Sequence, residues 1–291
     1  SIARIVKCGL HGTTTLIIML RFLPLILKNT LRNRRRSILT ILSVAASLCL
    51  LGVLFAVYQT LFLSDPTPLQ ALRLITRHKV SLAQELPASY GAKIRQVPGV
   101  REATVWSWFG GTYKDARDPN NFFAQFAVEP DRFFGVRSEV FVPEDQKKAF
   151  LTQRTGAMAS DRLVAKHGWK LGDRIPLFSD IYNAKMEFQL VAIYPDKEKE
   201  ETLYFNKEYL REVMGAQNPR ADSASTFYIL ADSPESVPRI AREIDAMFEN
   251  APQPTKTESE RQFALSFASF LGNLKLALMI VCASVTFTIL L

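Results

Sequence analysis

Cysteine is scarce in this chain of 291 residues, which has three, and none of them falls between residues 64 and 273. Cys8 lies in the N-terminal stretch, whereas Cys49 and Cys282 lie in apolar runs. A disulfide therefore cannot stabilise the long middle region. With about 210 residues, that region is long enough to bury one core, or two small ones, without covalent help.

The sequence also lacks the patterns that common active sites require. There is no GxxxxGK[ST] loop to bind phosphates, so we do not expect this chain to be an ATPase. The three histidines, His11, His78 and His167, are too few and too scattered for a metal site, and we expect each to be a surface or capping residue. Ser160 and Asp161 share one short predicted helix with His167 and follow no nucleophile elbow, which favours a helix cap over a hydrolase. We predict no catalytic residue, metal or cofactor.

Acidic residues are absent from the first 36 positions, which hold eight Lys and Arg residues. Residues 64–273 hold 27 basic and 28 acidic residues, so the basic excess of +8 lies ahead of the middle region. A nearly neutral domain has no positive electrostatic field to attract a phosphate backbone, and we therefore do not expect nucleic-acid binding. The basic cluster is instead typical of a segment beside anionic lipid headgroups.

A run without charged residues extends from Ser37 to Leu63 and directly follows a cluster of basic residues, Arg32, Arg34, Arg35 and Arg36. At about 1.5 Å per residue, a helix of this length exceeds a hydrocarbon core of about 30 Å. The run is too long for the apolar part of a signal peptide and ends in bulky residues, so we predict a retained transmembrane helix over 37–63. The arginines place the N-terminus in the cytoplasm and residues 64–273 outside.

Both ends of the sequence are interpreted from similar patterns. Residues 1–18 carry no initiating Met, and we expect them to be non-native or upstream, with Met19 as the natural start. Residues 19–36 are predicted to form a basic amphipathic helix along the cytoplasmic membrane surface. The apolar run at 274–291 stops without a polar flank, and we predict a second transmembrane helix that continues past it.

The middle region has the pattern of a mixed α/β domain. Its first half, 64–149, predicts strands at 73–82, 102–110 and 121–130, with a helix at 87–100 after the first strand. Its second half, 222–257, predicts a strand at 225–232, a helix at 233–250 and a short strand at 254–259. Together the two halves resemble a split βαβ arrangement.

Residues 150–221 have a different sequence pattern from the flanking halves and are predicted to be an inserted β-rich subdomain. Ser160 is expected to cap a short helix that Gly168 ends. A turn at 171–173 leads into a strand, and 185–196 alternates as its hairpin partner. The charged run 196–201 is interpreted as a solvated loop rather than a binding motif. The segment closes with a strand and a helix over 202–215.

Aromatic residues at strand spacing are expected to lie in the core, with a substrate groove as the alternative: Trp106, Trp108, Phe122, Phe123, Phe126, Phe133 and Phe134. A stalk helix is predicted over 258–273. A second apolar set at helical spacing follows it into the start of the second span: Phe263, Phe267, Phe270 or Leu271, and Leu274. The expected partner of this stalk helix is the outward end of the first span, including Leu61.

Several stretches carry a resemblance to a known family: "RTGAMASDRLVAKHGWKLGDRIPL", "FQLVAIYPD" and "LYFNKEYL". Together with the flanking spans, they resemble the MacB-type periplasmic core domain of FtsX-like ABC transporter permeases, from Met19 to Leu291. Val164 and Ala165 depart from the usual pattern. The resemblance implies a porter-like α/β part with an inserted sabre-like part, a separate cytoplasmic ATPase, and two paired permease copies. It also implies that ATP-driven movement is passed through the stalk, which is called mechanotransmission.

We therefore expect an α+β membrane protein in which two transmembrane helices flank a periplasmic porter-like domain with a sabre-like insert. The expected function is that of a non-catalytic permease subunit in a bacterial inner membrane, for export or extraction of a substrate. A two-span sensory receptor is the alternative, and a membrane-anchored enzyme is disfavoured by the missing catalytic residues.

Overall fold

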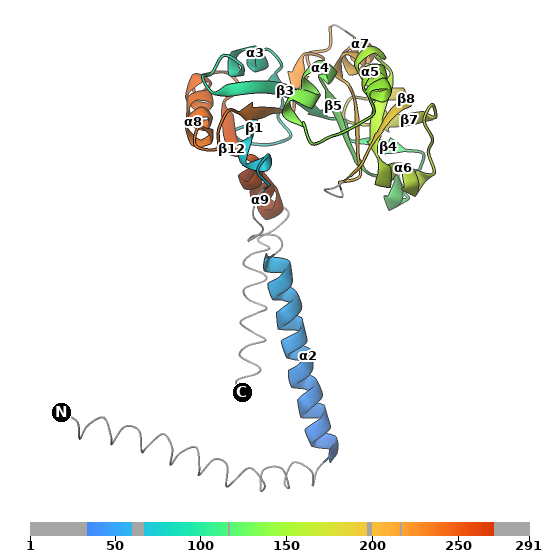
Figure 1. Cartoon of the computed structure of the whole chain (residues 1–291), viewed down its shortest axis with the longest axis vertical. Coiled ribbons are helices and arrows are strands. Elements are labelled where there is room, and N and C mark those ends of the chain that lie inside the picture. The colour runs from blue at the N-terminus through green and yellow to red at the C-terminus, as the bar shows by residue number, and fades with distance from the viewer. Residues whose placement is uncertain (1–33, 60–66, 116, 197–199, 216, 271–291) are drawn as a thin grey trace, which may run out of the picture. The chain divides into compact units, whose positions relative to one another are not determined.

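The computed structural model describes residues 34–59, 67–115, 117–196, 200–215 and 217–270 (Figure 1). The chain divides after Asp65 and after Ser266 into two compact units, which are described separately. The first unit contains α2 (Arg34–Tyr58), whose first turn carries no acidic residue. No helix in the described part of the chain combines the length and hydropathy needed to cross a membrane. The expected span at 37–63 lies partly outside the described residues, and the expected span at 274–291 lies wholly outside them.

The second unit is built on one long sheet (Figure 1). Within the described residues its strands follow the order β12 (Thr255–Ser259), β1 (Arg73–His78), β11 (Thr226–Ala231), β3 (Val100–Trp108), β5 (Ala124–Val128), β9 (Thr202–Asn206), β6 (Gly156–Ser160), β8 (Ala184–Tyr194), β7 (Arg174–Ser179) and β4 (Gly111–Tyr113). A separate small ladder pairs β2 (Leu86–Pro87) with β10 (Ser223–Ala224). The strands expected in the insert thus continue the same sheet as those of the flanking halves.

One end of the sheet is an antiparallel block of β12, β1, β11 and β3. It is covered by α3 (Tyr90–Ile94) and α8 (Val237–Met247), whose Ile240 and Ile244 are fully buried at i, i+4 spacing. The predicted helix at 87–100 is wrong in extent. β2 includes Pro87, where the predicted helix begins, and a turn that ends at Gly99, whose φ is 90°, follows α3. This block carries its own cluster of buried apolar side chains, including Leu74, Phe227 and Phe248.

The opposite face of β3 is covered by α4 (Pro130–Val136), and α5 (Glu144–Thr152) continues this cover over β6 and β8. Successive strand residues point to opposite faces, and so Val105 belongs to the cluster under α8, whereas Trp106 packs with Phe133 under α4. Trp106 stacks on Tyr228 with ring centroids 3.9 Å apart. These aromatic contacts join the two ends of the sheet through a shared core.

The other end of the sheet mixes parallel and antiparallel pairs. β5 runs parallel to β9 and β6 runs parallel to β8, whereas β7 and β8 form the predicted antiparallel hairpin. α6 (Asp161–His167) begins as expected, since Ser160 Oγ accepts a hydrogen bond from the Leu163 N–H at 3.3 Å. Gly168 ends this helix with a φ of 68°, a left-handed conformation that favours glycine. α7 (Lys207–Met214) follows β9.

β4, the last strand of the sheet, is joined to β5 by hydrogen bonds from a side chain. The Gln125 side chain bonds both backbone groups of Gly111 on β4, and the Phe109 N–H donates to the Gln125 carbonyl at 3.0 Å. The six strands from β5 to β4 therefore curl into a nearly closed layer around a core that includes Phe188 and Phe205. The remaining described elements are η2 (Gln70–Leu72), η3 (Pro119–Asn121) and α9 (Glu260–Phe270).

Candidate functional site: ion pairs at the start of α9

The first and last strands of the second unit, β1 and β12, are neighbours in the sheet. β1 and β12 pair antiparallel, with Leu74 opposite Ser259, so the residues just outside this pair, Arg73 and Glu260, lie side by side. Glu260 is the first residue of α9, which follows β12 without a loop. A contact between these two residues therefore ties the first strand of the unit to the helix that leaves it.

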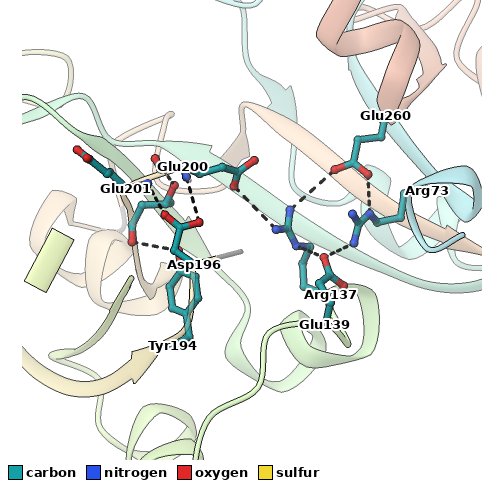
Figure 2. A network of polar contacts seen from close by, with 9 residues as sticks. Arg73, Arg137, Glu139, Tyr194, Asp196, Glu200, Glu201 and Glu260 are labelled. Carbon is teal, nitrogen blue, oxygen red and sulfur yellow. Dashed lines mark hydrogen bonds and ion pairs between the residues drawn. The ribbon is translucent and has the colours of Figure 1, made fainter. Parts of the chain in front are cut away.

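Arg73 makes this contact from a buried position, with only 1% of its surface exposed. Its Nε donates to Glu260 Oε2 at 2.7 Å, and its Nη1 pairs with Glu139 (Figure 2). Its Nη2 has no hydrogen-bond partner within the described residues. A buried guanidinium is tolerated only when carboxylates compensate its charge, so removal of one partner is costly.

A second buried arginine lies beside the first and reaches the same carboxylates. Arg137 follows the end of α4, and its Nε pairs with Glu139 Oε1 at 2.6 Å. Its Nη1 lies 3.8 Å from Glu260 Oε1, and its Nη2 lies 3.8 Å from Glu200 Oε2. Figure 2 shows Arg137 between Glu200 on one side and Glu260 on the other. Its guanidinium also lies 5.8 Å from the ring centroid of Trp106, within range of a cation–π contact.

Glu200 is held by hydrogen bonds to a neighbouring acidic residue, Asp196. The Asp196 carboxylate accepts hydrogen bonds from the Glu200 and Glu201 N–H groups, each at 3.0 Å. Lys166 on α6 pairs with Glu201 at 2.8 Å. The described residues of the run 196–201 belong to no helix or strand, as expected of a loop, and Glu200 is exposed, although Glu200 and Glu201 make ion pairs. Residues 197–199 lie outside the described part.

α9 has a second attachment to the sheet through Glu258 on β12. Glu258 pairs with Arg77 on β1 at 2.9 Å and with Lys256 at 2.8 Å, and it accepts a hydrogen bond from Ser266 Oγ on α9 at 3.1 Å. Burial alone would raise the pKa of this carboxyl, but the Lys256 and Arg77 charges and the Ser266 hydroxyl hold the pKa below its ordinary value. Two carboxylates two residues apart, Glu258 and Glu260, therefore hold the first turns of α9.

A separate buried polar junction lies on the opposite face of β3. Lys207 at the start of α7 donates to Ser107 Oγ at 3.1 Å, and Ser107 is completely buried. Nearby, the Glu85 carboxylate accepts from Tyr182 Oη at 2.9 Å and from Ser223 Oγ at 2.5 Å. Burial lowers the pKa of Lys207 to about 8, although the carboxylates of Glu85 and its neighbours partly oppose this shift. Substrate access to Ser107 is blocked by its burial, so this pair is structural.

The residues predicted from sequence fall largely outside this network. Arg34 and Arg35 begin α2 and are exposed, Arg36 is helical, and Arg32 lies outside the described residues. Phe263 is half-buried on α9. Phe267 and Phe270 are helical, but their side chains are outside the description, as are Leu61 and Leu274 entirely. The stalk packing therefore stays a prediction.

The histidine and aromatic predictions have mixed outcomes. His78 is buried rather than on the surface, and its Nδ1 accepts a hydrogen bond from the Val80 N–H at 3.2 Å, which agrees with the capping role that was the other expectation. His167 stacks on Trp169, and burial followed by the nearby Lys166 charge lowers its pKa. The His, Cys, Asp and Glu residues within the described segments form no group of three suited to a metal ion. His11 lies outside these segments.

Among the aromatic residues expected in the core, Trp106, Phe123 and Phe133 are buried, as predicted. Phe122 is 59% exposed and contradicts the prediction, because it adjoins the buried Phe123 and its side chain points the other way. Trp108, Phe126 and Phe134 are half-buried. The substrate-groove alternative for this set stays a prediction.

Sequence reasoning did not single out the arginines and glutamates of the network: Arg73, Arg137, Glu139, Glu200 and Glu260. One signal was available for Arg73. It heads a strand whose residues are buried on both faces, and an arginine in such a place requires a carboxylate partner. Nothing local to Arg73 indicates that the partner is Glu260, which lies 187 residues away.

Comparison with known proteins gives three findings. The sequence profile described as MacB-like periplasmic core domain matches residues 37–247. No curated protein sequence matches the chain. The chain is similar to three solved structures among others: the extracellular domain of the noncanonic ABC-type transporter YknZ from Gram-positive bacteria, the periplasmic region of MacB from Actinobacillus actinomycetemcomitans, and a domain of a putative permease protein from Porphyromonas gingivalis.

The three structures share little sequence with this chain. Identity is 12% for the YknZ domain, 6% for the MacB region and 15% for the permease domain, with TM-scores of 0.47, 0.47 and 0.44. The matches cover 64%, 68% and 66% of this chain, and 99%, 92% and 92% of those chains, in the same order. The profile spans well over half of the sequence, and the chain therefore belongs to the MacB-like periplasmic core domain family of ABC transporter permeases.

Proposed function

We propose that this chain is part of a permease subunit of an ABC transporter of the MacB and FtsX-like type in a bacterial inner membrane. In this proposal a separate cytoplasmic ATPase hydrolyses ATP, and a stalk over 258–273 passes the resulting movement to the periplasmic domain. The movement serves export or extraction of a substrate. Two permease copies form the working unit, and this chain contributes no catalytic residue.

Membrane insertion at 37–63 is supported by the surface of α2. Its apolar side chains are exposed along much of its length, as at Ile38, Leu42 and Phe55, which are 57%, 60% and 60% exposed. Apolar surface of this extent is unfavourable in water and favourable in lipid. Arg34 and Arg35 at its start fit the cytoplasmic side. The second span, 274–291, rests on the sequence pattern.

The observation that carries the mechanical part of the proposal is the contact between Arg73 and Glu260. A displacement of α9 is passed through this contact to β1, and β1 pairs with β11 and β12 inside the sheet. The link is buried on the Arg73 side, so water does not replace it cheaply. A passive membrane anchor would not need a charged, buried link of this kind at its junction.

The proposal is tested with the full-length permease reconstituted with its ATPase in lipid nanodiscs. Cys8, Cys49 and Cys282 are replaced by Ser, and a spin label is placed at the exposed Glu249→Cys position of each of the two copies. We expect the distance distribution between the labels to shift when ATP is bound and hydrolysed. Glu260→Gln, which keeps the side-chain volume but weakens the link, is expected to reduce this shift while ATP hydrolysis continues.

A matched control is Glu102→Gln, which weakens the 3.0 Å ion pair of Glu102 with Arg132 elsewhere in the same domain. It is expected to leave the ATP-dependent shift intact. An unchanged distribution in the unmodified protein on ATP addition would contradict the transporter and favour the sensory-receptor alternative. A full shift in Glu260→Gln would contradict the role of this contact.

A further inference from the structure

β12 and β4 are the two ends of the long sheet, as far as the described strands extend. The β4 end closes on itself, because the Gln125 side chain joins β4 to β5. β12 pairs with β1 on one side, and its other side is an edge at which a further strand could add backbone hydrogen bonds. The hydrogen-bond partners on this outer side therefore decide whether the sheet can grow.

The alternation of backbone groups shows which amides of β12 face outward. The Lys79 N–H donates to the Pro254 carbonyl at 2.9 Å, so the backbone of residue 254 faces the β1 side. In an antiparallel pair every second residue faces the same neighbour. The backbone groups of Thr255, Thr257 and Ser259 therefore lie on the outer side.

Two of these outward amides already donate to side chains of the same chain. The Thr257 N–H donates to Asp245 Oδ2 on α8 at 3.0 Å. The Ser259 N–H donates to Gln262 Oε1 at 3.3 Å, and the Gln262 N–H donates back to Ser259 Oγ at 3.3 Å. This reciprocal pair is a capping box at the start of α9. A strand added to this edge would first have to displace both side chains.

Asp245 is held in place by further hydrogen bonds. Its Oδ1 accepts from the hydroxyl of Thr255 at 3.0 Å and from that of Thr257 at 2.8 Å. Because the Thr257 hydroxyl donates its one proton to Asp245, the fully buried Thr76 hydroxyl donates to Thr257 across their 2.9 Å contact. Movement of the carboxylate away from the edge would leave these donors unpaired, which is unfavourable.

We propose that Asp245 and Gln262 protect the outer edge of β12 from pairing with β12 of a second copy of this chain. Two such strands would meet antiparallel about a two-fold axis at Thr257. This register places Lys256 of each copy opposite Glu258 of the other, so the unprotected edges would also attract each other by charge. With both side chains in place, copies of the chain have to associate through other surfaces.

The test measures the mass of the full chain in detergent by size-exclusion chromatography with multi-angle light scattering. The double variant Asp245→Ala with Gln262→Ala frees both amides, and its protein mass should be twice that of the unmodified chain at the same concentration. Asp232→Ala is the matched control, since it removes an exposed carboxylate just before α8 and leaves the edge protected. The mass of this control should equal that of the unmodified chain.

Thr257→Pro, added to the double variant, separates pairing at this edge from association elsewhere. Proline removes the outward amide at the centre of the new pairing and no bond between β12 and β1, so the mass should return to that of the unmodified chain. An unchanged mass in the double variant, or a doubled mass that persists with Thr257→Pro, would overturn the proposal.

Hydrogen exchange in the unmodified chain keeps the proposal testable if the double variant does not fold. The Thr257 amide should exchange at least about tenfold more slowly than an unstructured amide, because its donor is occupied although it lies on the outer edge. Exchange at the unstructured rate would show that Asp245 does not protect this edge and would overturn the proposal. The protection is a property of the folded domain, and neither result depends on the proposed function.

Discussion

The side-chain amide of Gln125 on β5 hydrogen-bonds to both backbone groups of Gly111 on β4. Its Nε2 donates to the Gly111 carbonyl at 2.8 Å, and its Oε1 accepts from the Gly111 N–H at 2.7 Å. Gln125 is fully buried, so water cannot replace these bonds. One side chain thus takes the place of a strand-to-strand pairing and closes the curled end of the sheet.

We predict that Gln125→Leu destabilises the chain by about 2–4 kcal/mol, because it leaves a buried N–H and a buried carbonyl without partners. The measurement is urea unfolding of the second unit within the full chain, followed by tryptophan fluorescence. Gln217→Leu, at an exposed position, is the control and should lie within about 0.5 kcal/mol of the unmodified chain. Equal midpoints for the two variants would show that Gln125 does not close the sheet.

Gly111→Ala and Gly168→Ala should have different effects. At Gly111 there is no space for a Cβ, whereas at Gly168 there is space but the backbone φ is unfavourable for alanine. A Cβ on Gly111 would lie 2.6 Å from Phe109 Cε1 and 2.8 Å from Gln125 Oε1. A Cβ on Gly168 would meet nothing within 4 Å, but the residue has a φ of 68°. We expect Gly168→Ala to cost about 1 kcal/mol and Gly111→Ala to cost more, measured by the same unfolding assay. The reverse order would contradict the packing described for β4.

Lys207 provides a pH-dependent prediction. Burial lowers its pKa to about 8 in the folded chain, below the ordinary lysine value of 10.5, so the unfolded chain binds more protons between these two pH values. Stability therefore rises as pH increases through this window, and the buried charge costs about 3 kcal/mol below it. Lys207→Met removes the titrating group, and its stability relative to the unmodified chain should be greatest near pH 7 and should fall toward pH 10.

The comparison at two pH values also serves as the control for Lys207. Loss of the Ser107 hydrogen bond in Lys207→Met is independent of pH and shifts both measurements equally. A stability difference that stays constant between pH 7 and pH 10 would show that the Lys207 ammonium is not held in an unfavourable environment.

Local patterns in the sequence predicted many elements of this fold, although not α4, α5, β4 or β6, because each pattern reflects a short-range geometry. β8 alternates buried and exposed residues over nearly its whole length, and α8 buries Ile240 and Ile244 one turn apart. The Ser160 cap and the Gly168 end of α6 lie within eight residues of each other. Such features depend on neighbours along the chain, and a sequence displays those neighbours directly.

Contacts that depend on sheet order could not be predicted in this way. Gln125 meets Gly111 only because the sheet curls back after β7, and Arg73 meets Glu260 only because β12 pairs with β1. Phe122 and Phe123 show a similar limit at short range. Alternation indicates that their side chains point in opposite directions, but the position of the core decides which of them is exposed.

The Arg73 network permits a final prediction that separates stability from coupling. Arg73→Met leaves Glu260 without its closest donor in a partly buried site, and we expect a loss of about 3–5 kcal/mol. In the double variant Arg73→Met with Glu260→Met, the Arg73 charge and its Glu260 partner are both absent, and Glu139 keeps its pair with Arg137 at 2.6 Å. Apolar replacement of a buried ion pair is often nearly neutral. Much of the lost stability should therefore return in urea unfolding. The link between β1 and α9 would still be missing, so hydrogen exchange at residues 264–266 should stay faster than in the unmodified chain. If the double variant recovers both stability and slow exchange, packing alone holds the start of α9, and the ion pair is not the element that connects the helix to the sheet.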